Sequence, residues 1–390
     1  MVSSLTTLVS FSPANTMTNI AIIGAGIGGI STAIFLRKFG FKCTVFEQAP
    51  EFLRLGAGIN FAPNGTRIFR AMGLGDEMLR VGVKPRLRSN RRWDTGEPFF
   101  SSDNIANAKK YGSEYVAFHR ADLHNMLVGA VGRETFQLGK RLTRLLAKDS
   151  SVELHFSDGT ILSFDAVVGA DGLNSIVRQY TTGLDDSQYF GHAAYRAIVP
   201  TEKLKGKIDL CDYIRWWGPN ESYVLTYCMK EDRAEYNVVA SGPETLQSTD
   251  LKPMPVPAKD MKATFNGFHA DAQLVLENCE DVSRWPMIVR TPKRPWSKGR
   301  VAILGDAAHP MTPHLGQGGG MAVEDAVILA RCLQAVDGKD IERAFQSYEA
   351  CRFERASEVQ FASQENKIGR GDRDPSWLFS YDATSVPIGM

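Results

Sequence analysis

The sequence lacks the features that would place it in several broad classes of protein. No stretch approaches the roughly 20 consecutive apolar residues that a membrane-spanning helix needs. Its 45 Lys and Arg residues are balanced by 44 Asp and Glu residues. This balance gives no electrostatic reason to expect nucleic acid or an anionic membrane as a partner. We therefore expect binding to neither.

Cysteine is also scarce. The chain has six cysteines: Cys43, Cys211, Cys228, Cys279, Cys332 and Cys351. None forms a Cys-x-x-Cys pair, so the sequence predicts neither a metal site nor a disulfide framework. We interpret the thiols as reduced and mostly buried, as in a cytoplasmic protein. Residues 1–16 have neither a basic signal-peptide start nor the Arg content of a transit peptide, and we interpret them as an extension.

What the sequence does contain begins at Asn19. The segment NIAIIG predicts a short buried strand, GAGIGGISTAIFLRKFG a glycine turn and a helix, and FKCTVFEQ a second strand. Such a βαβ unit is typical of an α/β fold with a parallel sheet. With 390 residues, 43% hydrophobic and 23% charged, the chain has the size and composition of a globular protein of two interlocked domains.

The rest of the chain predicts the other elements. Residues 64–82 and 119–131 have helical patterns, and a hairpin turning at Asp158 and Gly159 leads into a buried strand. Helices are also expected at about 321–334 and 341–365. Alternating, aromatic-rich stretches between about 189 and 289 predict a mostly antiparallel sheet.

These patterns divide the chain. We expect residues 17–188 and 290–365 to form one discontinuous dinucleotide-binding domain, residues 189–289 an inserted domain, and residues 366–390 a C-terminal segment. No internal repeat is visible.

The glycine motif lies between the first strand and the first helix. Gly24 allows a tight turn, Gly26 lets the backbone approach a pyrophosphate, and Gly29 lets the helix pack on the strand; Gly28 completes the motif. The pyrophosphate would then face a helix N-terminus. Glu47, at the end of the second strand, is placed to accept hydrogen bonds from a ribose. The motif leaves NAD and FAD both open.

Two later segments favour FAD. The first is DAVVGADG, which contains Asp171, and the second is GDAAHP, in which Asp306 follows a strand. An Asp at the carboxyl-terminal edge of a sheet, as expected for Asp306, can bond the hydroxyls of a ribityl chain, although it could also be a simple helix N-cap. Gly316, Gly318 and Gly319 then open a helix. Its N-terminus would stabilise the anionic form of a reduced flavin.

In this order and spacing, GAGIGG, GADGLNSIVR and GDAAHP resemble the class A flavoprotein aromatic hydroxylases, of the 4-hydroxybenzoate and salicylate hydroxylase type. The resemblance extends from Met17 to the C-terminus. Within that family, FEQAPEFLRLGAGI, HRADLH, RWW, GDAAHPMTPHLGQG and DPSWLFSYD are similar to the 6-hydroxynicotinate 3-monooxygenases. The resemblance implies a Rossmann-like FAD-binding domain with an inserted, mostly antiparallel β-sheet substrate domain.

The resemblance also implies contacts to FAD. They are expected from Glu47, Gln48, Arg120, Leu142 (through its backbone) and Asp306, with Arg54 close to the same ligand. A guanidinium such as that of Arg120 can hold a phosphate or a carbonyl with two hydrogen bonds. Without the resemblance, a structural ion pair would explain Arg120 as well.

The implied reaction has two halves. NADH or NADPH reduces the flavin, and oxygen then adds to give a flavin C4a-hydroperoxide that hydroxylates a small hydroxylated aromatic or pyridine carboxylate. Whether the ring carboxylate is lost stays open. Only one dinucleotide fingerprint is present, so we expect the nicotinamide co-substrate to visit transiently. The expected partners are the aromatic substrate and O2, and the expected state is a monomer or a homodimer.

Five positions are candidates for the substrate pocket. His314 is the first candidate for a base near the ring hydroxyl, and Tyr227 for relaying a proton or orienting the ring. A structural histidine and a core aromatic are the alternatives. The 6-hydroxynicotinate enzymes have histidine where this chain has Asn60, and a histidine and a tyrosine where our alignment places Ser222 and Thr226. These differences predict a different ring or different substituents.

Three other readings compete. One is a related FAD fold acting as an epoxidase or reductase on a non-aromatic substrate, which usually needs a long apolar channel or membrane attachment. A second is a non-catalytic FAD-fold binding protein, and intact Gly24, Gly26, Gly29, Glu47 and Asp306 speak against it. An NAD-dependent dehydrogenase is disfavoured by the two later segments.

Overall fold

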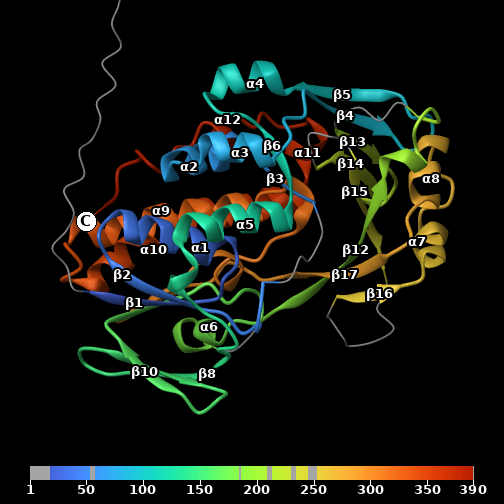
Figure 1. Cartoon of the computed structure of the whole chain (residues 1–390). Helices are drawn as coiled ribbons and strands as arrows, with labels where there is room; N and C mark the ends of the chain where they lie inside the picture. The colour runs from blue at the N-terminus through green and yellow to red at the C-terminus, as the bar shows by residue number, and fades with distance from the viewer. Residues whose placement is uncertain are drawn as a thin grey trace, which may run out of the picture.

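The computed structural model describes residues 18–52, 58–183, 186–208, 213–229, 234–244 and 253–389. Two large β-sheets organise these residues, one mostly parallel and one mostly antiparallel, and Figure 1 shows them on different sides of the molecule. The mixed α/β architecture that the sequence predicts is confirmed.

The first sheet has six strands in the order β18-β19-β11-β1-β2-β7. Their bounds are β1 Asn19–Ile23, β2 Lys42–Phe46, β7 Phe136–Gln137, β11 Ala166–Gly169, β18 Ser297–Lys298 and β19 Val301–Ile303. All pairings except β18–β19 are parallel. The strand β1 lies between β11 and β2, and it is buried from Ile20 onward, which explains its nearly continuous apolar sequence.

Helices cover one face of this sheet. Figure 1 shows α1, α5, α9 and α10 on that side, with α6 and a small sheet on the other. The bounds of these helices are α1 Ile27–Lys38, α5 Arg120–Val131, α6 Ile176–Thr181, α9 Gly318–Ala335 and α10 Ile341–Glu365. The small sheet has the order β10-β9-β8, with β8 Leu142–Ala147, β9 Val152–Phe156 and β10 Ile161–Phe164.

One predicted helix is two in the structure. Residues 64–82 form α2 (Pro63–Met72) and α3 (Gly75–Val81). Gly73 follows α2 in the left-handed conformation, with φ +89°, and such a residue ends a helix. A two-stranded sheet of β3 (Gly58–Phe61) and β6 (Val116–His119) lies beside these helices in Figure 1.

The second sheet has eight strands in the order β16-β17-β12-β15-β14-β13-β4-β5. Their bounds are β4 Leu87–Arg92, β5 Pro98–Asp103, β12 Gln188–Pro200, β13 Tyr213–Trp217, β14 Tyr223–Cys228, β15 Glu235–Pro243, β16 Met254–Val256 and β17 Val282–Val289. The predicted range 189–289 is incomplete for this sheet, because β4 and β5 also belong to it. The strand β4 joins through a parallel pairing with β13, the one parallel contact in the sheet.

The two faces of the second sheet have different neighbours. The helices α7 (Ala258–Thr264) and α8 (Ala270–Glu277) cover the outer face, at the edge of the molecule in Figure 1. Trp216 belongs to the core under these helices, whereas Tyr213, Tyr223 and Tyr227 belong to the cluster on the inner face. Because neighbouring residues of a strand point to opposite faces, this division assigns each strand position to one side.

Three short helices complete the described chain. They are α4 (Asn104–Tyr111), α11 (Lys367–Arg370) and α12 (Ser376–Phe379). The last two lie in the C-terminal segment. This segment contacts the second sheet, because the side-chain amide of Asn90 on β4 donates to the carbonyl of Gly369 on α11. In the ranges described, no helix combines the length and the apolar character that crossing a membrane requires.

Candidate active site

The glycine turn after β1 is packed on one side and open on the other. Gly24 has φ +103°, and a Cβ there would overlap the carbonyl oxygen of Ala170. A Cβ on Gly29 would overlap the carbonyl oxygen of Gly24, and one on Gly28 would lie 2.7 Å from Leu304 Cδ1. A Cβ on Gly26 would meet no protein atom within 4 Å. The chain therefore leaves space at Gly26 and none at the other three.

Glu47 follows β2 and lies against this turn. Its Oε2 accepts from the backbone N–H of Ala25 at 2.9 Å, and its Oε1 accepts from the N–H of Ala49 at 2.9 Å. His124 on α5 lies on the same turn, with Nε2 2.8 Å from the carbonyl oxygen of Ala25. The carboxylate is thus held at the rim of the turn, beside the N-terminus of α1.

The other residues predicted to contact FAD differ in their exposure to solvent. Gln48 and Arg120 are exposed, Arg120 at the first position of α5. The side chain of Leu142 is buried in the core at the start of β8, so a contact through its backbone is the available one. Arg54 lies outside the described residues.

The side chain of Asp171 caps the start of α6. Its carboxylate accepts from Ser175 Oγ at 2.5 Å and from the N–H groups of Ile176 and Val177 at 2.8 and 3.2 Å. Burial raises the pKa of this carboxyl. The carboxylate of Asp171 is thus engaged by the start of α6, while its backbone lies at Gly24, so the predicted contact of Asp171 with FAD would be made through its backbone.

The second cofactor segment packs against the glycine motif, because a Cβ on Gly28 would lie 2.7 Å from Leu304 Cδ1 and 3.2 Å from Ala322 Cβ. Asp306, in a 3-10 turn at Gly305–Ala307, is exposed, and a Cβ on Gly318 would lie 4.0 Å from its Oδ1. Gly319 approaches Phe61, whose Cζ would be 2.8 Å from an added Cβ. Gly316 has φ +64° and is pressed against the Asn60 amide.

These features fit FAD. The helices α1 and α9 both begin without a side-chain cap and without an acidic residue in the first turn, so their free N–H groups and positive ends suit anionic groups. The open position at Gly26 suits a pyrophosphate, and the carboxylates of Glu47 and Asp306 suit ribose and ribityl hydroxyls.

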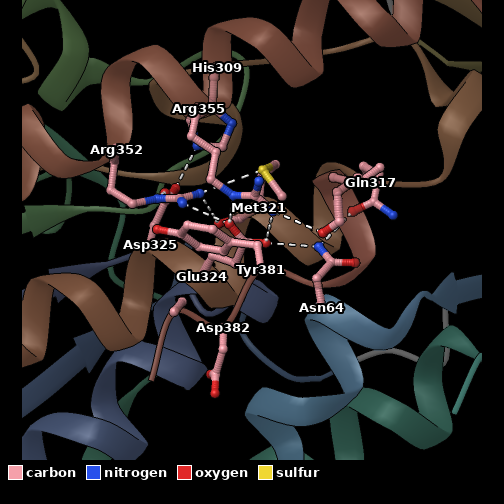
Figure 2. Close-up of polar contacts among 12 residues, drawn as sticks. Asn64, His309, Gln317, Met321, Glu324, Asp325, Arg352, Arg355, Tyr381 and Asp382 are labelled. Carbon is pink, nitrogen blue, oxygen red and sulfur yellow. Dashed lines mark hydrogen bonds and ion pairs between the residues drawn. The ribbon is translucent and has the colours of Figure 1, made fainter. Parts of the chain in front are cut away.

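A buried ion cluster lies beneath the second segment (Figure 2). Asp325 on α9 accepts from the N–H of Gly305 at 3.0 Å, and its Oδ2 lies 2.5 Å from Nε2 of His309. Arg352 on α10 donates through Nε to Asp325 at 2.7 Å and through Nη1 to Glu324 at 2.7 Å. Burial acts to raise the pKa of Asp325, but His309 and Arg352 outweigh it and hold the pKa at about 2.

The same cluster extends to the glycine helix. Asn64 on α2 donates to Glu324 at 2.8 Å and to the side chain of Gln317, the N-cap of α9, at 3.0 Å. Arg355 pairs with Glu324 as well and lies over the ring of Tyr381, 3.6 Å from its centroid. Figure 2 shows these side chains converging from α2, α9 and α10. The Gly305 turn and the start of α9 are therefore anchored to one set of charges.

Stacked tyrosines on the inner face of the second sheet lie close to Asn60 and form the candidate substrate site. The rings of Tyr213 and Tyr227 stack with centroids 5.6 Å apart and an interplanar angle of 11°. The hydroxyl of Tyr115 donates to Asn60 Oδ1 at 2.8 Å. Burial raises the pKa of Tyr227, so its hydroxyl remains protonated and can both donate and accept a hydrogen bond.

His314 lies in the loop between Asp306 and α9 and is 1% exposed. Its Nδ1 lies 3.1 Å from the carbonyl oxygen of Ser363, which requires a proton on Nδ1. Its Nε2 is buried and has no hydrogen-bond partner among the described residues. Burial lowers the pKa of His314 to about 4. The ring is therefore neutral at pH 7, with a lone pair on Nε2 that can accept a proton.

Arg215 is a functional candidate that the sequence reasoning missed. It is 4% exposed, and it donates through Nη1 to the carbonyl of His314 at 3.1 Å and through Nη2 to the hydroxyl of Tyr213 at 2.8 Å. It borders a cavity of about 30 Å³ that Tyr115 and His314 also line. The alternation in YIRWW could have placed it on the inner face with Tyr213.

Ser222 and Thr226 do not reach this pocket. Thr226 pairs with Ile214 and Val238, which both belong to the core under α7 and α8. The hydroxyl of Ser222 donates to the carbonyl of Pro219 at 2.7 Å. The prediction that both share a pocket with Tyr227 is wrong. Thr226 and Tyr227 are neighbours on β14 and point to opposite faces of the sheet. Ser222, just before β14, lies near Phe265 and Phe268 under α7 and α8.

Comparisons with known proteins identify the family and the fold. Residues 17–363 match the family described as FAD binding domain. The chain is 38% identical to a 6-hydroxynicotinate 3-monooxygenase of Bordetella bronchiseptica, over 95% of this chain and 96% of that protein. It resembles Klebsiella pneumoniae HpxO complexed with FAD and uric acid, at 27% identity and a TM-score of 0.80 over 91% and 89% of the two chains. A salicylate hydroxylase substrate complex shares the fold, at 24% identity and a TM-score of 0.79 over 96% and 97%.

Proposed function

Because the chain belongs to the FAD binding domain family, we propose that it is an FAD-dependent monooxygenase that hydroxylates a small aromatic or pyridine carboxylate bearing a ring hydroxyl. Membership in the family confirms the predicted fold class and the FAD cofactor. The observation that supports the proposed chemistry best is the buried Nε2 of His314, which has no partner among the described residues and faces aromatic side chains.

Bound FAD supplies the activated oxygen once NADH or NADPH has reduced it. The chain supplies orientation, a base and a dry cavity. His314 accepts the proton of the ring hydroxyl at Nε2, and this makes the ring carbon ortho or para to that oxygen more nucleophilic. The Ser363 carbonyl holds the tautomer that this step needs, and Arg215 holds the backbone of the loop.

The pocket walls exclude water. Tyr213 and Tyr227 on the sheet and Asn60 on β3 are all buried, and the ring of Tyr223 lies 5.8 Å from that of His314. A dry pocket protects a reactive oxygen species from wasteful loss. Asn60 can bond a substrate hydroxyl or carboxylate but cannot act as a base. We propose that the nicotinamide co-substrate binds transiently and that the chain works as a monomer or a homodimer.

The proposal is tested by a screen for stimulated NADH and NADPH oxidation in FAD-loaded protein. Hydroxynicotinates, hydroxybenzoates, salicylate and aminobenzoates are supplied singly, with peroxide measured alongside and the product identified by mass. We expect at least one ring acid to raise the rate and to gain one oxygen atom. If no aromatic changes the rate, or if all electrons appear in peroxide, the proposed function is wrong.

A further inference from the structure

Arg196 on β12 stands on the inner face of the eight-stranded sheet. One row of residues crosses the strands in register: Arg196 pairs with Val239, Val239 with Leu225, and Leu225 with Arg215. Neighbouring strands lie about 4.8 Å apart, so the backbones of the two arginines are about 14 Å apart. Val239 and Leu225 form an apolar floor between them.

The two arginines at the ends of this floor differ in their partners. Both terminal nitrogens of Arg215 are committed, to His314 and to Tyr213. The guanidinium of Arg196 has no hydrogen bond and no carboxylate within the described ranges; its Nε is buried, and its only ring contact is with Trp285, 4.9 Å from the centroid. Arg284, on the next strand, pairs with Glu244 at 2.7 Å.

Among the residues that the structure describes, the surroundings of Arg196 add positive charge and no carboxylate. Burial lowers the pKa of Arg196, Arg120 lowers it further, and the hydroxyls of Tyr227 and Tyr223 act in the opposite direction. Arg196 is half-buried, with its Nε enclosed and unpaired, and a ligand carboxylate would supply the anion that the described surroundings lack. The planar guanidinium can hold a carboxylate with two parallel hydrogen bonds.

We propose that Arg196 binds the carboxylate of the ring substrate and thereby restricts the enzyme to ring acids. This inference rests on the proposed function. The ring then lies over Val239 and Leu225, and its far edge points toward Tyr223 and the Nε2 of His314. The carboxylate and the reacting hydroxyl are thus recognised at opposite ends of one floor.

The test compares an acid with its amide in FAD-loaded protein. 6-Hydroxynicotinate and 6-hydroxynicotinamide, or 4-hydroxybenzoate and 4-hydroxybenzamide, are titrated while the flavin spectrum is followed, and KM is measured where turnover occurs. In Arg196→Gln we expect Kd and KM for the acid to rise about 100-fold, as for the loss of one charge-assisted pair. The amide constants should change less than about threefold. Arg196→Lys, which keeps the charge but not the fork, should lie between.

Arg92→Gln is the matched control, because Arg92 lies on the same sheet but is exposed and pairs with Asp94. It should leave the acid-to-amide ratio unchanged. If Arg196→Gln weakens acid and amide equally, or raises KM for NADH while sparing the acid, the proposal is wrong. The binding titration needs no turnover. A wild-type protein that binds the acid more tightly than the amide but oxidises no aromatic would therefore overturn the proposed function and leave the role of Arg196 intact.

Discussion

Replacing Arg352 by methionine tests whether the buried ion cluster positions the cofactor loops. The change removes the guanidinium between Asp325 and Glu324, and breaking a buried pair costs about 3–5 kcal/mol. Glu324 keeps Arg355, and Asp325 keeps His309, so we expect the lower end, about 3 kcal/mol. With an unfolding entropy of about 2.1 cal/mol/K per residue, roughly 0.8 kcal/mol/K for this chain, the Tm of FAD-free protein should fall by about 4 °C.

The same variant should also bind FAD more weakly. Asp325 holds the N–H of Gly305, next to Asp306, and a loosened turn must be ordered when FAD binds. A tenfold rise in Kd corresponds to about 1.4 kcal/mol and reduces the increase in Tm that added FAD produces. Thermal unfolding over a series of FAD concentrations measures both effects.

Arg331→Met is the control, because Arg331 donates only to the backbone carbonyls of Ala383 and Val386. It should lower Tm by less and leave the FAD-dependent increase unchanged. An Arg352→Met protein with wild-type Tm, or with reduced Tm but wild-type FAD affinity, would refute the positioning role.

Three further predictions follow from single positions. Gly26→Ala should keep the Tm of FAD-free protein within about 1 °C, because its Cβ meets no atom within 4 Å, yet lower the affinity for FAD at least tenfold in a fluorescence titration. Gly29→Ala, by contrast, should not give a folded holoprotein. An unchanged FAD affinity in Gly26→Ala would count against the site. Thr226→Val should leave kcat/KM unchanged and the free energy of unfolding equal or higher, because the buried hydroxyl has no partner in the described chain; lost activity would contradict its placement under α7 and α8. His314→Asn should lower kcat about 10²–10⁴-fold. The pKa of His314 is about 4 in the folded chain and 6.5 ordinarily, so the unfolded chain binds the extra proton, and about 3 kcal/mol of stability present above pH 6.5 is lost as the pH falls to 4. Urea unfolding at pH 7 and pH 4.5 should show a smaller loss of stability in the variant than in the wild type. An equal loss would show that His314 is not the titrating group.

Local signals were enough for much of the fold. The glycine motif, the helix at 341–365 and the alternating strands around 213–243 depend on periodicities that neighbouring residues determine. The pairing of β4 with β13 joins Arg88 to Tyr213, residues 125 positions apart, and no local pattern encodes such a contact. The sheet was therefore predicted too narrow.

The cofactor turn was predictable because it is formed by consecutive residues of one segment. The substrate pocket was not, because its residues come from several strands. The Gly26 turn follows from its own sequence. Thr226 and Tyr227 are neighbours in the chain, and their side chains point to opposite faces of the sheet because alternate residues of a strand do so. An alignment alone does not show which of the two faces the pocket. Arg196 and Arg215 have the sequence surroundings of ordinary strand residues, and only the assembled sheet shows that the guanidinium of Arg215 has hydrogen-bond partners.

The separation of the two cofactor segments in the chain has a consequence for biosynthesis. The glycine turn is complete by Gly29, but α9 begins at Gly318, 289 residues later. Of the two parallel neighbours of β1, β2 is made at once, at Lys42–Phe46, whereas β11 begins only at Ala166. At translation rates of about 5–20 residues per second, the second wall emerges roughly 15–60 s after the first. Until then the nascent βαβ unit offers only the glycine half of the FAD site, and the edge of β1 that pairs with β11 is open until β11 is made.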